Sequence, residues 1–225
     1  MKGKKSEAIG DLANQRSRLV EYISGFAVKR HETKDAFNAV RRENFMPPNM
    51  RQYAYADDAI PIWNNQTISQ PSTISIMLEL LEVKQGMNVL EVGSGGGYVL
   101  ALLSKMVGAD GKVYGVEISE ELFEKSSENL AKEGIANAIV RKGDGANGWK
   151  ENAPFDRVLV SCACPFIPKE LFNELKEGGR IVAPVGDQHT QVMEIMMKVK
   201  GKPMKKSYEG TLFAFVPLKG RHGFK

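Results

Sequence analysis

A glycine-rich loop between a strand and a helix is the feature that most narrows the fold of this chain. The segment Glu91-Val92-Gly93-Ser94-Gly95-Gly96-Gly97-Tyr98 ends a short apolar run, 89–92, and opens an amphipathic stretch, 98–106. Glycines in such a turn let backbone amides approach a ligand closely, and this is where open α/β sheets bind nucleotide cofactors. We therefore expect a cofactor at the end of the first strand.

Short apolar segments alternate with amphipathic ones after residue 87, a pattern typical of a parallel sheet covered by helices on both faces. The expected strands cover 89–92, 112–118, 138–141, 157–162 and 180–185, and the expected helices cover 98–106, 120–132 and 169–175. Segments 191–199 and 208–218 follow without a helix between them and read as a hairpin joined through Gly201, Lys202 and Pro203. The prediction is a doubly wound, Rossmann-like α/β sheet with an antiparallel hairpin at its C-terminal edge.

The region before the sheet reads as a helical extension. Apolar residues recur at helical spacing from Ile9 to Ile23 and over 34–42, and an ordered loop is expected over 53–66. Ser69 or Ser72 is expected to cap a helix that ends near residue 81. Because no repeat or linker interrupts the chain, we expect one domain, 1–225, with a helical cap and substrate loop over 1–82 and the cofactor-binding sheet over 83–225.

The chemistry of the loop favours S-adenosylmethionine over a dinucleotide. The pattern is E-x-G-x-G-x-G, and Tyr98 stands where a dinucleotide fingerprint requires glycine. S-adenosylmethionine carries an ammonium and a sulfonium group, and the negative charge of Glu91 would attract both. The same charge would repel the pyrophosphate of a dinucleotide. Glu117, at the end of the second strand, is suited to two ribose hydroxyls.

Asp144, after the third strand, is suited to an adenine amino group, although it is also suited to forming a turn. The spacing therefore predicts a methyltransferase of the class I type. The predicted cofactor-binding residues are Glu91, Gly93, Ser94, Gly95, Gly97, Tyr98, Glu117, Ile118, Gly143 and Asp144.

Composition excludes several functional classes. Thirty-one basic and 27 acidic residues give a net charge of +4, too weak a basic excess to predict binding to nucleic acid. The two cysteines, Cys162 and Cys164, are too close for an unstrained disulfide, and no secretory signal or membrane-spanning run precedes or interrupts the chain. The three histidines show no metal-ligand spacing. We expect a cytoplasmic protein without a metal or membrane partner.

The sequence resembles the protein-L-isoaspartate O-methyltransferases from about residue 40 to residue 224. The matching motifs are Arg42-Glu43-Asn44-Phe45-Met46-Pro47, Tyr53-Ala54-Tyr55-Ala56-Asp57, Gln66-Thr67-Ile68-Ser69, the glycine loop, Gly143-Asp144-Gly145, Pro154-Phe155-Asp156, Gly178-Gly179-Arg180, Pro184-Val185-Gly186 and Phe215-Val216-Pro217-Leu218. The Gln-Thr-Ile-Ser element is the specific one, because many methyltransferases share the glycine loop.

The resemblance implies methylation of the α-carboxyl of L-isoaspartyl residues in damaged proteins. It implies that Ser69 is the active-site serine, that Thr67 binds substrate and that the backbone of Val216 meets the substrate peptide. The target carboxylate is already ionised near pH 7, so catalysis needs positioning rather than a general base. This chain departs from the family at Ser72, where a histidine is common.

Alternatives remain open from sequence. Thr67 and Ser69 also suit the start of the following helix, a role compatible with catalysis. A tRNA adenine methyltransferase would use the basic N-terminal residues Lys2, Lys4, Lys5, Arg16 and Arg18. A non-catalytic S-adenosylmethionine-binding module would fit the replacement at Ser72, and oligomeric state is not predicted.

Overall fold

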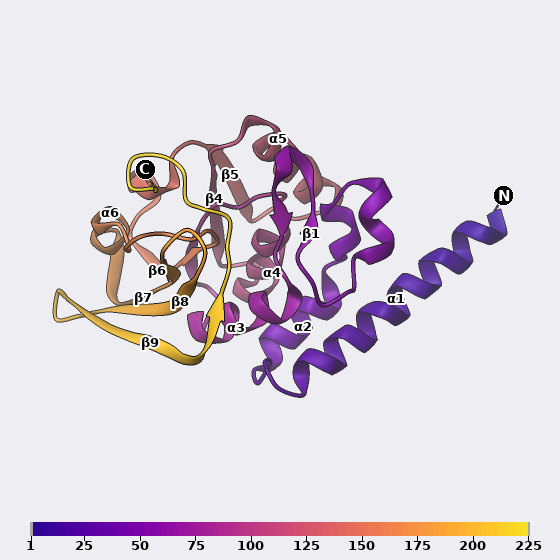
Figure 1. Cartoon of the computed structure of the whole chain (residues 1–225), viewed down its shortest axis with the longest axis horizontal. Helices are drawn as coiled ribbons and strands as arrows, with labels where there is room; N and C mark the ends of the chain where they lie inside the picture. Colours follow the sequence, from indigo (N-terminus) through magenta and orange to yellow (C-terminus); the bar gives the residue numbers. More distant parts are fainter. Residues whose placement is uncertain (1, 225) are drawn as a thin grey trace.

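A mixed seven-stranded sheet forms the centre of the protein, with strands in the order β5-β4-β3-β6-β7-β8-β9 (Figure 1). The computed structural model describes residues 2–224, with side chains described from residue 11. The strands are β3 (Asn88–Val92), β4 (Lys112–Glu117), β5 (Ala138–Lys142), β6 (Phe155–Val160), β7 (Leu175–Gly186), β8 (Gln191–Val199) and β9 (Lys202–Phe213), with a separate pair of β1 (Ile60–Pro61) and β2 (Thr67–Ile68). Strands β3 to β7 pair in parallel, whereas β8 and β9 are antiparallel.

Helices cover both faces of the sheet. The α-helices are α1 (Lys2–Ser24), α2 (His31–Ala39), α3 (Pro71–Leu81), α4 (Tyr98–Val107), α5 (Glu120–Lys132) and α6 (Lys169–Asn173). Short 3-10 helices are η1 (Arg42–Phe45), η2 (Pro48–Tyr53), η3 (Trp63–Asn65), η4 (Gly145–Asn147) and η5 (Lys150–Asn152). The described residues include no helix long and apolar enough to cross a membrane.

The alternation of side chains along β3 shows why two hydrophobic cores form. Val89 packs into the core built by α1 to α5, while Leu90 and Val92 point to the opposite core, which includes Leu171 of α6. Burial on both faces explains the nearly continuous apolar character of this strand. The doubly wound sheet with a C-terminal antiparallel hairpin, expected from the sequence, is confirmed.

The second strand of the hairpin begins and ends earlier in the chain than the sequence predicted. This strand begins at Lys202 and ends at Phe213, rather than covering 208–218. A two-residue turn suffices because Lys200 and Gly201 adopt φ of 51° and 72°, as tight hairpins require, and Glu177 accepts both of their N–H groups. Residues 214–218 leave the sheet and run beside residue 163.

Several other boundaries differ by a few residues from those expected. Helix α2 covers His31–Ala39 instead of 34–42, and β7 begins at Leu175, where the last turn of the preceding helix was expected. Strand β6 is displaced two residues towards the N-terminus, because Phe155 already pairs with Leu175.

Neither Ser69 nor Ser72 caps α3, contrary to expectation. The N-cap position is Gln70, Pro71 occupies the first turn, and no side chain of the N-cap residue forms a capping hydrogen bond. Instead, the Ser72 N–H donates to Asp57 Oδ1 at 2.8 Å. Proline is tolerated at the first helical position because the N–H that it lacks would have no partner within the helix. A carboxylate near a helix N-terminus is stabilising, because it interacts favourably with the helix dipole. The loop before the helix therefore supplies its cap.

Candidate active site

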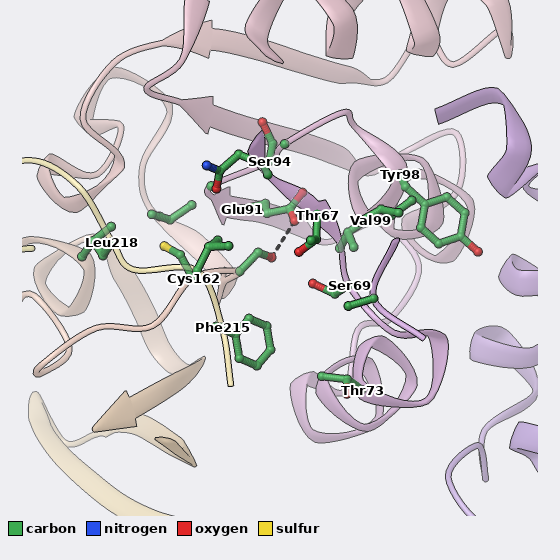
Figure 2. Close-up of a pocket in the computed structure, with 18 of the residues that line it drawn as sticks. Thr67, Ser69, Thr73, Glu91, Ser94, Tyr98, Val99, Cys162, Phe215 and Leu218 are labelled. Atoms are coloured by element: carbon green, nitrogen blue, oxygen red, sulfur yellow. Dashed lines mark hydrogen bonds between the residues drawn. The ribbon is translucent and has the colours of Figure 1, made fainter. Parts of the chain in front are cut away.

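A cavity of about 590 Å³ opens where β3, β4 and β6 end. The loops after all three strands line it, together with the segment around Thr67–Ser72 and the residues after β9 (Figure 2). Strand β3 lies between β4 and β6, so the chain order reverses here, the position where open α/β sheets bind ligands. The volume lies within the range typical of small-molecule sites.

The glycine loop has a backbone conformation that other residues rarely adopt. Gly97 has φ of 92°, and a Cβ at this position would lie 2.8 Å from the Ser126 Oγ of α5. Gly95, with φ of 53°, donates its N–H to Glu117 Oε2 at 2.8 Å. Of the glycine-loop residues predicted to bind the cofactor, Gly93, Ser94 and Gly95 line the cavity, whereas Gly97 does not.

Glu91 is the most perturbed carboxylate of the cavity. Its side chain is 1% exposed, and Oε1 accepts a hydrogen bond of 2.7 Å from the Ser161 hydroxyl (Figure 2). Among the described residues, Oε2 has no hydrogen-bond partner. Burial raises the pKa of Glu91 to about 8; the Ser161 hydrogen bond lowers it and the neighbouring Glu117 raises it. A cation in the cavity would favour the ionised form.

Glu117 and Ile118 lie at the end of β4, and both line the cavity. Glu117 is 5% exposed and accepts N–H groups from Gly95 and Ser119 through different oxygens, at 2.8 and 2.9 Å. These bonds orient the carboxylate while leaving each oxygen a further lone pair for a hydroxyl. Ile118 is 42% exposed, so its apolar side chain is accessible at the edge of the cavity.

Asp144 occupies a different position from the one expected of an adenine ligand. Neither Gly143 nor Asp144 lines the cavity, although Gly145 does. Asp144 accepts N–H groups from Ala146 at 3.0 Å and from Arg221 at 2.7 Å, so the carboxylate forms a turn and also holds the C-terminal segment. The turn-forming role is observed, and contact with adenine stays a prediction.

Hydroxyl groups meet the cavity opposite the sheet. Figure 2 shows the side chains of Thr67 and Ser69 between Glu91 and Thr73, and all four residues line the cavity. Within the described part of the chain, neither the Thr67 nor the Ser69 hydroxyl forms a side-chain hydrogen bond, so both can donate to a ligand. Ser72, the replacement for the family histidine, also lines the cavity and is 8% exposed.

Val216 lies on the segment that follows β9. Its carbonyl oxygen accepts a hydrogen bond from the Ala163 N–H at 2.9 Å. The Val216 N–H is therefore the backbone group that could bind a peptide. Gln191, 1% exposed, accepts the Phe215 N–H at 2.8 Å and donates to the Asp187 carbonyl at 2.8 Å. Gln191 thus holds this segment against the sheet, a role that sequence analysis missed because the contact spans 24 residues.

The side chain of Tyr98 turns away from the cavity. In Figure 2 its ring points away from Glu91. The ring packs edge-on against Phe45 at 5.6 Å, and the buried Arg42 guanidinium lies over it at 5.1 Å. Burial raises the pKa of Tyr98 to about 12, while Arg42 opposes the shift. The phenol therefore joins the helical cap to α4, although Tyr98 is still among the residues that line the cavity; its contact with the cofactor stays a prediction.

Trp63 packs on the glycine loop. A Cβ on Gly96 would lie 3.5 Å from the Trp63 ring, and Lys125 lies 6.0 Å from its centroid. Trp63 anchors the substrate loop to the sheet side of the site.

The donor set fits a cationic adenosyl cofactor. Glu91 offers a buried carboxylate oxygen with no other partner, Glu117 offers an oriented carboxylate at the strand end, and the glycine turn leaves room beside them. The described residues contain no cluster of His, Cys, Asp and Glu that could hold a metal ion. The residues present therefore fit S-adenosylmethionine.

Comparisons with known proteins agree with this geometry. The sequence profile of the family Protein-L-isoaspartate(D-aspartate) O-methyltransferase matches residues 14–223. The chain belongs to the protein-L-isoaspartate O-methyltransferase family.

Curated members of this family are similar over most of their length. The chain is 45% identical over 204 residues to a protein-L-isoaspartate O-methyltransferase of Methanococcus maripaludis, covering 90% of this chain and 94% of that protein. It is 38% identical over 218 residues to one of Pyrococcus abyssi, covering 96% and 99%.

Solved structures show the same fold. A protein-L-isoaspartate O-methyltransferase aligns with a TM-score of 0.84 and 29% identity, over 92% of this chain and 67% of that one. A protein from Plasmodium falciparum, in complex with S-adenosyl-L-homocysteine, aligns with a TM-score of 0.79 and 23% identity, over 91% of this chain and 98% of that one. Family, fold and S-adenosylmethionine-dependent methyl transfer, all expected from the sequence, are confirmed, and no comparison favours either alternative function.

Proposed function

We propose that this protein methylates the α-carboxyl of L-isoaspartyl residues in proteins and peptides, using S-adenosylmethionine. The observation that carries the proposal is the single cavity that holds both the cofactor-type carboxylates, Glu91 and Glu117, and the free hydroxyls of Thr67 and Ser69. One cavity therefore offers adjoining places to the cofactor and the acceptor.

On the cofactor side, S-adenosylmethionine supplies the electrophilic methyl group. Glu91 would face its cationic methionine portion, and Glu117 would accept from its ribose hydroxyls. The backbone of Gly93, Ser94 and Gly95 would lie against it, with Ile118 on the base; Gly97, which does not line the cavity, would act by shaping the loop through its φ of 92°. The positions of Gly143 and Asp144 fit an indirect role, because Asp144 shapes the 144–146 turn beside the cavity.

On the acceptor side, Ser69 and Thr67 would orient the substrate carboxylate. The nucleophile is already ionised near neutral pH, so no proton has to be removed before it reacts. Hydroxyl donors hold a carboxylate without neutralising it, which preserves its nucleophilicity and its direction of approach. The Val216 N–H would bind the substrate backbone.

The partners are isoaspartyl-containing proteins and peptides. We assign the enzyme to the cytoplasm, where proteins retain reduced thiols, because Cys162 and Cys164 are free and buried. Burial also raises the pKa of both thiols, which makes them unreactive as nucleophiles.

A methyl-transfer assay tests the proposal. The protein is incubated with methyl-labelled S-adenosylmethionine and a peptide that contains one isoaspartate, beside the same peptide with normal aspartate. We expect label, as a base-labile ester, in the isoaspartyl peptide alone. Equal labelling of both peptides, or labelling of neither, would refute it.

A further inference from the structure

We infer that Phe26, Ile76 and Leu212 form an outer apolar subsite that binds an uncharged, apolar side chain two or three residues from the isoaspartate. This inference rests on the proposed function, since it concerns the peptide on either side of the reacting residue.

The cavity extends well beyond the reacting groups. Phe26, in the turn after α1, Ile76 of α3 and Leu212 of β9 all line it. Phe26 is 54% exposed and Leu212 is 69% exposed, unusually high values for large apolar side chains beside a cavity. Apolar side chains that line a cavity and remain exposed mark a surface that a ligand covers.

Two walls lead outward from the reacting groups. One is α3, whose Thr73 and Ile76 lie on the same side of the helix, after the segment that carries Ser69; Figure 2 shows Thr73 on the far side of Ser69 from Glu91. The other is the segment that runs back along the chain from Val216 through Phe215 to Leu212. A substrate chain leaving the site passes between these walls.

The length of the first wall sets which substrate residue reaches the subsite. Pro71 and Ile76 belong to one helix, so they are separated by roughly 8 Å along its axis at about 1.5 Å per residue. An extended peptide covers that distance in two to three residues, at roughly 3.3 Å each. The side chain two or three residues from the isoaspartate is therefore the one expected to reach Ile76, with Phe26 and Leu212 lining the same cavity.

The charges of the cavity support an apolar preference. The charged residues that line it, within the part of the chain that the structure describes, are Glu91, Glu117 and Lys219. The first two belong to the cofactor side, and Lys219 precedes the Gly220–Arg221 segment that covers Asp144. A charged substrate side chain at the outer subsite would lose hydration without gaining a partner.

Methylation kinetics test the inference. Peptides with one isoaspartate carry leucine, serine or aspartate at the second or third position on either side, and kcat and KM are measured for each. We expect kcat/KM for leucine to exceed that for aspartate about tenfold at one of these positions, mainly through KM. Phe26→Ser and Leu212→Ser should each reduce that ratio at least threefold.

Ile139→Ser is the matched control, because Ile139 is 51% exposed on β5 and lies outside the cavity lining. The control should keep the wild-type ratio, and circular dichroism confirms that each variant folds. Equal kcat/KM for leucine and aspartate at every position would overturn this inference while the proposed function stands. No methylation of any isoaspartyl peptide by the wild-type protein would overturn both.

Discussion

The Ser161 hydroxyl donates a 2.7 Å hydrogen bond to one oxygen of the buried Glu91 carboxylate, whose other oxygen has no partner among the described residues. Burial without a neighbouring cation disfavours the ionised form of the Glu91 carboxyl and raises its pKa to about 8. A cationic cofactor would reverse that preference, and protonation is thereby coupled to binding.

Cofactor affinity is therefore expected to depend on pH. A bound cation lowers the pKa of Glu91, so binding releases a proton, and affinity rises with pH until it levels off above about 8. Calorimetric titration with S-adenosylmethionine from pH 6 to 9, in two buffers of different ionisation enthalpy, measures both effects. Glu91→Gln should remove the proton release; wild-type affinity that is constant with pH would contradict the assignment.

The stability of the free protein should fall as pH rises. The pKa of Glu91 is raised from 4.5 in the unfolded chain to about 8 in the folded one, so the folded state binds more protons between these values. Stability is then present below the unfolded pKa and is lost as pH rises towards 8. Thermal melts from pH 5 to 9 should show a smaller decrease for Glu91→Gln than for the wild type.

The exposed Glu121 provides the control for these melts. Glu121→Gln is expected to follow the wild-type pH dependence, since the carboxylate is solvated in both states. If Glu91→Gln behaves like Glu121→Gln, the buried carboxyl is not the group that titrates.

Ser69→Ala should lower kcat/KM for an isoaspartyl peptide by roughly 10- to 100-fold, the effect of losing one hydrogen bond to a charged group. The affinity for S-adenosylmethionine should change little, because the hydroxyl lies on the acceptor side. Ser127→Ala is the control, since Ser127 is exposed on α5 and donates only to the Phe123 carbonyl. A Ser69→Ala enzyme with wild-type kcat/KM would exclude a role in catalysis.

Asp57→Ala should destabilise the protein by about 1 kcal/mol, a typical value for a lost helix cap. The Asp57 carboxylate accepts from the Ser72 N–H and from the Gln70 side chain, so its removal frees both the start of α3 and the loop before it. Urea unfolding measures the change, with Asp58→Ala as the exposed neighbour. The peptide KM should rise as well, because Ser69 precedes this helix; equal stability of the two variants would refute the capping role.

The order of strands and helices could be predicted from the sequence because it depends on local patterns of residues. Apolar alternation, the glycine loop and the acids at strand ends are properties of neighbouring residues, and they led to the correct sheet and cofactor. The family came from a resemblance carried by short motifs, above all Gln66-Thr67-Ile68-Ser69. The position of β9 was predicted wrongly because the turn before it is shorter than residue propensities indicate: Lys200 has a left-handed φ of 51°, so the hairpin turns in two residues. That conformation is supported by Glu177, 23 residues away along the chain.

What the sequence determined by itself was the class of fold and the chemistry of the loop, since both follow from residue type and spacing. Only the tertiary structure decided that Asp57 caps α3, that Asp144 holds Arg221 and that Ser161 meets Glu91 across a separation of 70 residues. The protonation of Glu91 belongs to the second group. The charge of a carboxyl group depends on which groups surround it in space and on how much water they exclude. Neither can be predicted from the residues next to it in the sequence.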